Sequence, residues 1–145
     1  MDSQFTIVIA DDHPLFRGAL YQAVHMAIDE ARLLEADSID SLTHLLAEHP
    51  EVDLLLLDLK MPGANGFEGL AYLRGQYPDL PIVVVSASED AAIIQQVLRL
   101  GALGFIPKSV PMKELVSALN TVIGGDNWVP EGISLHPEPS EGPDF

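Results

Sequence analysis

The chain has 145 residues, the size of one ordinary domain, and its formal net charge at pH 7 is −15. It contains no cysteine, which excludes disulfide bonds, thiolate metal sites and thiol nucleophiles. The acidic excess repels phosphate backbones, so we do not expect this chain alone to bind nucleic acid. No apolar run approaches the roughly 20 residues that span a bilayer, and residues 1–4 do not resemble a secretory signal. We therefore expect a cytoplasmic protein that does not bind membranes.

Short apolar runs alternate with longer stretches of helical periodicity along the chain. The short runs, which predict strands, cover residues 5–10, 32–36, 53–57, 81–85 and 104–106. Three of the five are almost wholly apolar, which is typical of strands buried on both faces of a parallel sheet. Five successive strand–helix units predict a doubly wound α/β fold with a five-stranded parallel sheet in the flavodoxin-like order 2-1-3-4-5.

Local signals mark the ends of the predicted helices. Ser38 and Ser88 stand where helix N-caps are expected, and Glu89 and Asp90 would add negative charge to the first turn after Ser88. Helices are expected to end at three glycines, Gly101, Gly124 and Gly125.

The composition changes after residue 125. The last twenty residues contain four prolines, five acidic residues and neither lysine nor arginine. We predict a domain over residues 1–125 and an acidic, proline-rich linker or tail over residues 126–145, in which residues 128–130 still pack on the domain.

Acidic side chains follow two of the predicted strands. Asp11 and Asp12 come directly after the first strand, and Asp58 comes after the third. In the predicted strand order these strands are neighbours, and ligands of such sheets bind beyond their carboxyl ends. One acid alone would be interpreted as a polar strand end, but three at this point would repel one another. Because Mg²⁺ prefers oxygen ligands, the three carboxylates predict a magnesium site.

Two further polar residues follow the remaining strands at the same edge of the sheet. Ser86 ends the fourth strand and Lys108 follows the fifth. A metal, a hydroxyl and an ammonium group together suit a tetrahedral dianion such as a phosphoryl group. Carboxylate nucleophiles form aspartyl phosphates in known covalent mechanisms, with metal and lysine neutralising the transferring oxygens.

These residues give the sequence a resemblance to the receiver domain of two-component response regulators. Residues 58–66, DLKMPGANG, are similar to that family's D-x-x-M-P-x-x-x-G loop, and the acidic pair, Ser86-Ala87 and Lys108 complete the pattern. The resemblance covers roughly residues 5–124. Residues 11–17 (DDHPLFR) and 104–108 (GFIPK) look most like LuxR/NarL-type transcriptional regulators. The resemblance therefore implies a flavodoxin-like receiver fold.

The resemblance also implies roles for individual residues. Asp58 would accept a phosphoryl group from the phosphohistidine of a sensor histidine kinase or a phosphotransfer protein. The Mg²⁺ ligands would be Asp11, Asp12, Asp58 and the backbone carbonyl of Lys60. On phosphorylation, Lys108 would contact the phosphoryl oxygens, Ser86 would move to bond them, and Phe105 would change rotamer in concert.

Two residues near this site have simpler interpretations. His13 lies beside the acids, but the Asp12-His13-Pro14 sequence predicts the start of a helix rather than a metal ligand, because Mg²⁺ prefers oxygen. Phe105 on its own would be interpreted as a core aromatic residue. The family's usual switch threonine is replaced by Ser86, a smaller hydroxyl that still forms hydrogen bonds.

The resemblance implies a phosphoacceptor switch rather than an enzyme, with at most slow self-catalysed phosphorylation and dephosphorylation. The alternatives are a stand-alone receiver in a phosphorelay and a small aspartyl-phosphate phosphatase. The phosphatase is disfavoured because Asp58 is not followed by a second acid two residues on. We expect a receiver cut from a longer transcription factor, in which a missing C-terminal domain binds DNA, and we hypothesise a homodimer on phosphorylation.

Overall fold

The computed structural model describes residues 5–133, so the part of the predicted linker from residue 134 onward lies outside the described residues. Strands and helices alternate strictly along the chain. In order, the elements are β1 (Phe5–Ala10), α1 (Pro14–Ala27), β2 (Ala31–Ala36), α2 (Ile39–Glu48), β3 (Leu54–Asp58), α3 (Phe67–Gln76), β4 (Ile82–Ser86), α4 (Ala91–Arg99), β5 (Gly104–Pro107) and α5 (Met112–Ile123). The strands form one parallel sheet in the order β2-β1-β3-β4-β5, which confirms the predicted topology.

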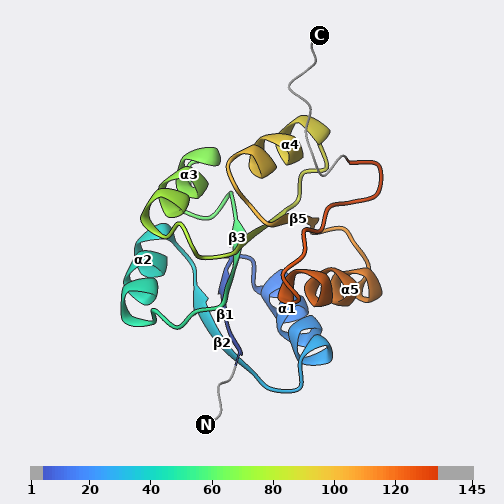
Figure 1. Ribbon diagram of the computed structural model, residues 1–145, viewed down its shortest axis with the longest axis horizontal. Coiled ribbons are helices and arrows are strands. Elements are labelled where there is room, and N and C mark those ends of the chain that lie inside the picture. The colour runs from blue at the N-terminus through green and yellow to red at the C-terminus, as the bar shows by residue number, and fades with distance from the viewer. Residues whose placement is uncertain (1–4, 134–145) are drawn as a thin grey trace.

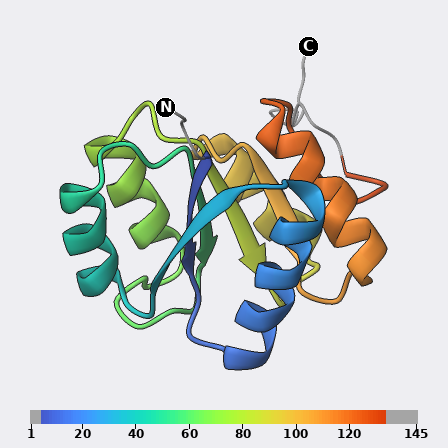
Figure 2. The ribbon, with the colours of Figure 1, turned by 90° about the horizontal axis from the view of Figure 1, so that it is seen from below.

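The sheet lies between two layers of helices, with α1 and α5 on one face and α2, α3 and α4 on the other (Figures 1 and 2). Successive strand side chains point to opposite faces. In β1, Val8 belongs to the core cluster under α2, α3 and α4, whereas Ile9 belongs to the cluster under α1 and α5. The inner strands β1, β3 and β4 are buried on both faces, which explains their continuous apolar sequences.

The edge strand β2 differs from the inner strands because it is only partly covered. Its polar residues Arg32 and Glu35 are exposed, and this matches the mixed sequence of the segment. Beyond its other edge, the sheet is extended by a bridge between Gly104 in β5 and Trp128 after α5. The N–H of Phe105 donates to the carbonyl of Trp128 at 3.0 Å, and Trp128 packs on the α5 side of the core. Trp128 thus packs on the domain.

The helix ends confirm one predicted cap and correct the other. The Ser38 hydroxyl accepts the N–H of Ser41 at 3.1 Å and caps α2, as expected. The prediction for Ser88 was wrong: α4 begins at Ala91, and its N-cap is Asp90, whose Oδ1 accepts the N–H of Ala92 at 2.9 Å. Ser88 instead accepts the N–H of Asp90 at 3.2 Å within the loop. Glu89 and Asp90 therefore precede the first turn of α4 rather than lying in it.

The predicted glycines do lie at helix ends. Gly101 follows the C-cap of α4, Gly124 is the C-cap of α5, and Gly125 follows it with a φ of +95°. None of the described helices combines the length and the apolar character needed to cross a membrane.

Candidate functional site

The carboxylates of Asp11 and Asp58 meet at the carboxyl edge of the sheet because β1 and β3 are neighbours. Ala10 pairs with Leu57, so the residue after each is carried to the same level. The side chains of Asp11 and Asp58 are 0% and 2% exposed, whereas that of Asp12, the next residue along, is 35% exposed. The structure therefore brings the three predicted carboxylates together, two of them buried and one at the opening.

Lys108 projects its ammonium group between the two buried carboxylates. Its Nζ lies 3.0 Å from Oδ2 of Asp11 and 3.1 Å from Oδ2 of Asp58. The backbone N–H of Lys108 donates to the carbonyl of Ser86 at 2.7 Å, which fixes the loop after β5. The ammonium also lies 5.1 Å from the ring centroid of Phe16, a favourable cation–π arrangement. Lys108 thus partly compensates two negative charges that are otherwise buried.

Backbone N–H groups hold the two buried carboxylates in place. Oδ1 of Asp58 accepts the N–H of Lys60 at 3.0 Å, and Oδ1 of Asp11 accepts the N–H of His13 at 2.7 Å. Oδ2 of Asp11 is buried and accepts no hydrogen bond of acceptable geometry from any described residue, although the Lys108 ammonium is close. The charge that faces this oxygen is therefore the Lys108 ammonium, at 3.0 Å.

The residues present fit a divalent cation. Asp11, Asp12, His13 and Asp58 each offer one ligand atom, and these atoms all lie within 4.8 Å of one another. Three of the four are carboxylate oxygens, the donors that Mg²⁺ prefers. The N–H of Lys60 donates to Asp58, so the backbone of Lys60 lies beside this cluster.

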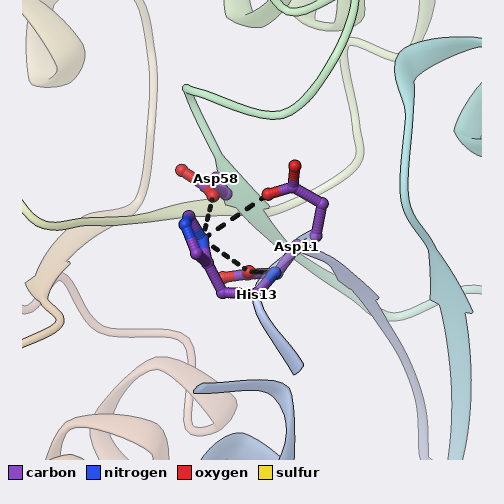
Figure 3. A group of neighbouring side chains, drawn as sticks. Asp11, His13 and Asp58 are labelled. Atoms are coloured by element: carbon purple, nitrogen blue, oxygen red, sulfur yellow. Dashed lines mark hydrogen bonds and ion pairs between the residues drawn. The ribbon is translucent and has the colours of Figure 1, made fainter. Parts of the chain in front are cut away.

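The imidazole of His13 joins this cluster, which the sequence analysis did not predict. Its Nδ1 lies 3.4 Å from Oδ1 of Asp11, 3.5 Å from Oδ1 of Asp12 and 3.5 Å from Oδ2 of Asp58 (Figure 3). His13 is the N-cap of α1 and Pro14 follows it, so the predicted helix start is confirmed. Its extended backbone, with φ −101° and ψ 106°, directs the side chain toward the strand ends instead of along the helix. The signal in the sequence was its position directly after two acids.

Ser86 and Phe105 lie on the neighbouring strands but outside the charged cluster. The buried hydroxyl of Ser86 accepts the N–H of Ser88 at 3.1 Å. Phe105 is fully buried in the core between the sheet and α4. Beside Ser86 is a cavity of about 580 Å³, lined by the loop between β3 and α3 together with Ser88 and Ile93.

The loop between β3 and α3 owes its shape to three kinds of residue. The side chain of Met61 is buried, and the carbonyl of Pro62 accepts the N–H of Ile39 at 3.0 Å, which ties the loop to α2. Gly66 has φ +63° and ψ −123°, a combination that only glycine adopts without strain. The loop therefore holds Lys60 and Asp58 at the end of β3 and returns the chain into α3.

Comparison with known proteins supports the interpretation of this geometry. The family model described as response regulator receiver domain matches residues 7–120. The glycerol metabolism activator of Pseudomonas putida is 39% identical over 129 residues, which are 89% of this chain and 58% of that protein. The nitrate/nitrite response regulator protein NarL of Escherichia coli K12 is 36% identical over 129 residues, 89% of this chain and 59% of that protein.

A solved structure shows the same fold. The isolated REC domain of RcsB from Salmonella enterica serovar Typhimurium, determined in the presence of the phosphomimetic BeF3−, has a TM-score of 0.79 and 26% identity. The match covers 89% of this chain and 95% of that one. The chain spans 58% and 59% of the lengths of the two curated relatives.

The chain belongs to the receiver domains of two-component response regulators. Within them, its similarity to NarL and to a LuxR-family response regulator from Silicibacter pomeroyi assigns it to the LuxR/NarL type. Receiver domains of this family generally act as phosphorylation-dependent switches and bind Mg²⁺ through an acidic pocket of this kind.

Proposed function

We propose that Asp58 is the phosphoryl acceptor of this receiver and that a sensor histidine kinase or a phosphotransfer protein is the donor. In the transfer, a carboxylate oxygen of Asp58 forms a bond to phosphorus while the bond between phosphorus and the donor's imidazole nitrogen breaks. The imidazole leaves with the electron pair. The observation that carries the proposal is the Lys108 ammonium, which lies 3.1 Å from Oδ2 of Asp58 and 3.0 Å from Oδ2 of Asp11.

The residues of the site have different roles in the transfer, which follow from the charge that each supplies. Mg²⁺, held by Asp11, Asp12, Asp58 and the Lys60 carbonyl, would supply positive charge to the transferring phosphoryl oxygens. Lys108 would exchange its contact with Asp58 for a contact with the phosphoryl group on the same carboxylate, a small movement for its long side chain. The N–H of Lys60 donates to Oδ1 of Asp58 and orients the carboxylate for attack.

The switch follows from contacts that exist only with a phosphoryl group on Asp58. The Ser86 hydroxyl leaves the N–H of Ser88 and bonds a phosphoryl oxygen, and the change in the loop lets Phe105 adopt another rotamer. Because Phe105 lies beneath α4, such a change alters the surface formed by α4, β5 and α5. We propose a switch with at most slow self-catalysed phosphorylation and dephosphorylation.

The output belongs to a longer protein. By analogy with the relatives named above, we propose that this receiver controls transcription through a DNA-binding domain outside residues 5–133, in the cytoplasm. This chain itself has a net charge of −15, which disfavours direct binding to DNA. The phosphatase alternative has no comparable support from the comparisons.

Chemical phosphorylation tests the acceptor assignment directly. The full chain is incubated with acetyl phosphate and Mg²⁺ and followed by intact mass spectrometry. We expect the addition of one phosphoryl group to the wild type and to the control Asp126→Asn, an exposed acid away from the site, and none to Asp58→Asn. Labelling of Asp58→Asn to the same extent would refute the assignment, and rapid multiple turnover with free phosphate release would support the phosphatase.

We also propose that phosphorylation produces a homodimer. Helix α1 exposes large apolar side chains, Leu15 at 92% and Met26 at 62%, and it packs beside α5. Sedimentation with Mg²⁺, with and without beryllofluoride, tests this proposal. We expect a larger species only with beryllofluoride and only when Asp58 is intact. The same mass with and without beryllofluoride would contradict the proposed homodimer.

A further inference from the structure

Asn65 is followed by a glycine in the loop between β3 and α3. The chain contains three asparagines, and the residues that follow them are Gly66, Thr121 and Trp128. An asparagine side chain can react with the backbone nitrogen of the next residue, and a glycine has no Cβ to block the approach. By its sequence, Asn65 is therefore the asparagine best suited to forming a cyclic imide with its own main chain.

The structure leaves both reacting groups accessible. Asn65 and Gly66 are exposed and precede α3, which begins at Phe67. Their φ angles are +51° and +63°, so neither residue belongs to a helix or a strand that would fix the main chain. The N–H of Glu68 donates to the carbonyl of Asn65 at 3.3 Å, whereas the N–H of Gly66 donates to no backbone carbonyl among the described residues.

The other two asparagines are held by their surroundings. Asn120 lies inside α5, where the helical main chain keeps the following nitrogen in a hydrogen-bonded turn. The side-chain Nδ2 of Asn127 donates to the carbonyl of Leu103 at 2.6 Å, and a tryptophan follows it. Both residues therefore serve as internal controls for Asn65.

We infer that Asn65 is a site of spontaneous deamidation. The backbone nitrogen of Gly66 loses its proton to solvent and forms a bond to Cγ of Asn65. The bond between Cγ and Nδ2 breaks, and Nδ2 takes up a proton and leaves as ammonia, so that a five-membered cyclic imide remains. Water then adds to one of the two imide carbonyl carbons and breaks the bond from that carbon to nitrogen. The complete reaction consumes one water, releases one ammonia and involves no oxidation or reduction.

The position at which water opens the imide decides the product. Opening at Cγ gives aspartate with the original main chain. Opening at the main-chain carbonyl carbon gives isoaspartate, in which the main chain passes through Cγ and is one atom longer. The former carbonyl of Asn65, which accepts the N–H of Glu68, then becomes a free carboxylate outside the main chain. Isoaspartate therefore changes the geometry of the loop, whereas aspartate changes only its charge.

The loop that would be lengthened also carries Asp58. Two successive turns connect them: the N–H of Met61 donates to the carbonyl of Asp58 at 3.3 Å, and the N–H of Ala64 donates to the carbonyl of Met61 at 2.9 Å. Asn65 also lines the cavity beside Ser86. On the basis of the proposed function, we expect the isoaspartyl chain to accept a phosphoryl group at Asp58 more slowly than the original chain.

Ageing of the full chain in warm, mildly alkaline buffer tests the modification. Tryptic peptides are followed by mass spectrometry, and fragmentation of the peptide over residues 61–74 distinguishes isoaspartate from aspartate. We expect the mass gain of an NH2-to-OH exchange at Asn65, with Asn120 and Asn127 unconverted. The variant Asn65→Gln should not convert, because its longer side chain would have to close a six-membered ring. An unconverted Asn65, or equal conversion at Asn120 and Asn127, would overturn the inference.

Chemical phosphorylation tests the consequence. Deamidated chains carry one more negative charge and are separated from the original chain by anion exchange, then incubated with acetyl phosphate and Mg²⁺. The control is Asn65→Asp, which has the added charge without the added main-chain atom. We expect a slow fraction equal to the share of isoaspartate, labelled on the order of tenfold more slowly, since a misplacement of about 1 Å at a reacting group can cost about a hundredfold. Asn65→Asp should be labelled at close to the wild-type rate.

The two measurements separate this inference from the proposed function. Labelling of the isoaspartyl fraction as fast as Asn65→Asp would overturn the effect on phosphorylation. Equal slowing of Asn65→Asp would also overturn it, because charge and not main-chain length would then be the cause. Failure of the fresh wild type to be labelled would instead refute Asp58 as the acceptor, while the conversion of Asn65 would still be decided by the peptide masses.

Discussion

The ammonium nitrogen of Lys108 lies 3.1 Å from Oδ2 of Asp58, although 50 residues separate the two in the chain. The contact forms across two strand ends, because Asp58 ends β3 and Lys108 follows β5, with β4 between them. It places one cation against two buried carboxylates, those of Asp58 and Asp11. The site thus carries an excess of buried negative charge that a single lysine does not balance.

This excess predicts that Lys108 stabilises the folded chain. Replacing it in Lys108→Met leaves two neighbouring buried carboxylates without their cation. We expect the free energy of unfolding without divalent metal to fall by about 2–4 kcal/mol, since breaking a buried ion pair leaves an uncompensated charge. Urea unfolding measures the change, with Lys113→Met on the exposed side of α5 as the control. A loss in Lys108→Met no greater than in the control would contradict the role.

The same excess predicts that Mg²⁺ stabilises the fold. A ligand that binds only the native state at one hundred times its dissociation constant adds about 2.7 kcal/mol. We expect an increase of this order in the unfolding free energy of the wild type, and its reversal by EDTA. The increase should largely disappear in Asp11→Asn and persist in Asp126→Asn. Equal Mg²⁺ stabilisation in both variants would show that the ion binds outside the acidic cluster.

Much of the site could be predicted from the sequence because it is built at the ends of strands. The five apolar runs predicted the sheet, and the parallel order carried Asp11, Asp12, Asp58 and Lys108 to one edge. The convergence of these residues depends on backbone topology alone. The roles proposed for them in phosphorylation came from the family resemblance and remain predictions.

What the sequence did not reveal depends on local side-chain geometry. Ser88 and Asp90 are both good N-cap residues two positions apart, and the pattern alone could not decide between them. His13 was assigned only to a helix start, because its turn toward the acids depends on its extended backbone before Pro14. The bridge from Trp128 to β5 is a long-range pairing of a single residue, too short to leave a periodic signal.

The bridge to Trp128 predicts an unusual sensitivity at Gly104. A Cβ on Gly104 would lie 2.6 Å from the carbonyl oxygen of Trp128, so Gly104→Ala must displace that segment. We expect a loss of about 1–2 kcal/mol in unfolding free energy, because the Phe105 N–H loses its acceptor. The emission of Trp128, the only tryptophan, should shift to the red as the side chain leaves its half-buried position. Wild-type emission and stability in Gly104→Ala would show that the bridge does not hold this segment.

Gly66 and Gly18 form a matched pair that separates backbone strain from steric clash. A Cβ at either position meets nothing within 4 Å, yet Gly66 has a φ of +63°, whereas Gly18 lies inside α1. We expect Gly66→Ala to destabilise the chain by about 1–3 kcal/mol through strain alone. Gly18→Ala should instead stabilise it by roughly 0.5–1 kcal/mol, because alanine loses less entropy in a helix. Urea unfolding of both variants measures the difference. If both substitutions changed stability in the same direction, the left-handed backbone at Gly66 would not be what keeps glycine in this loop.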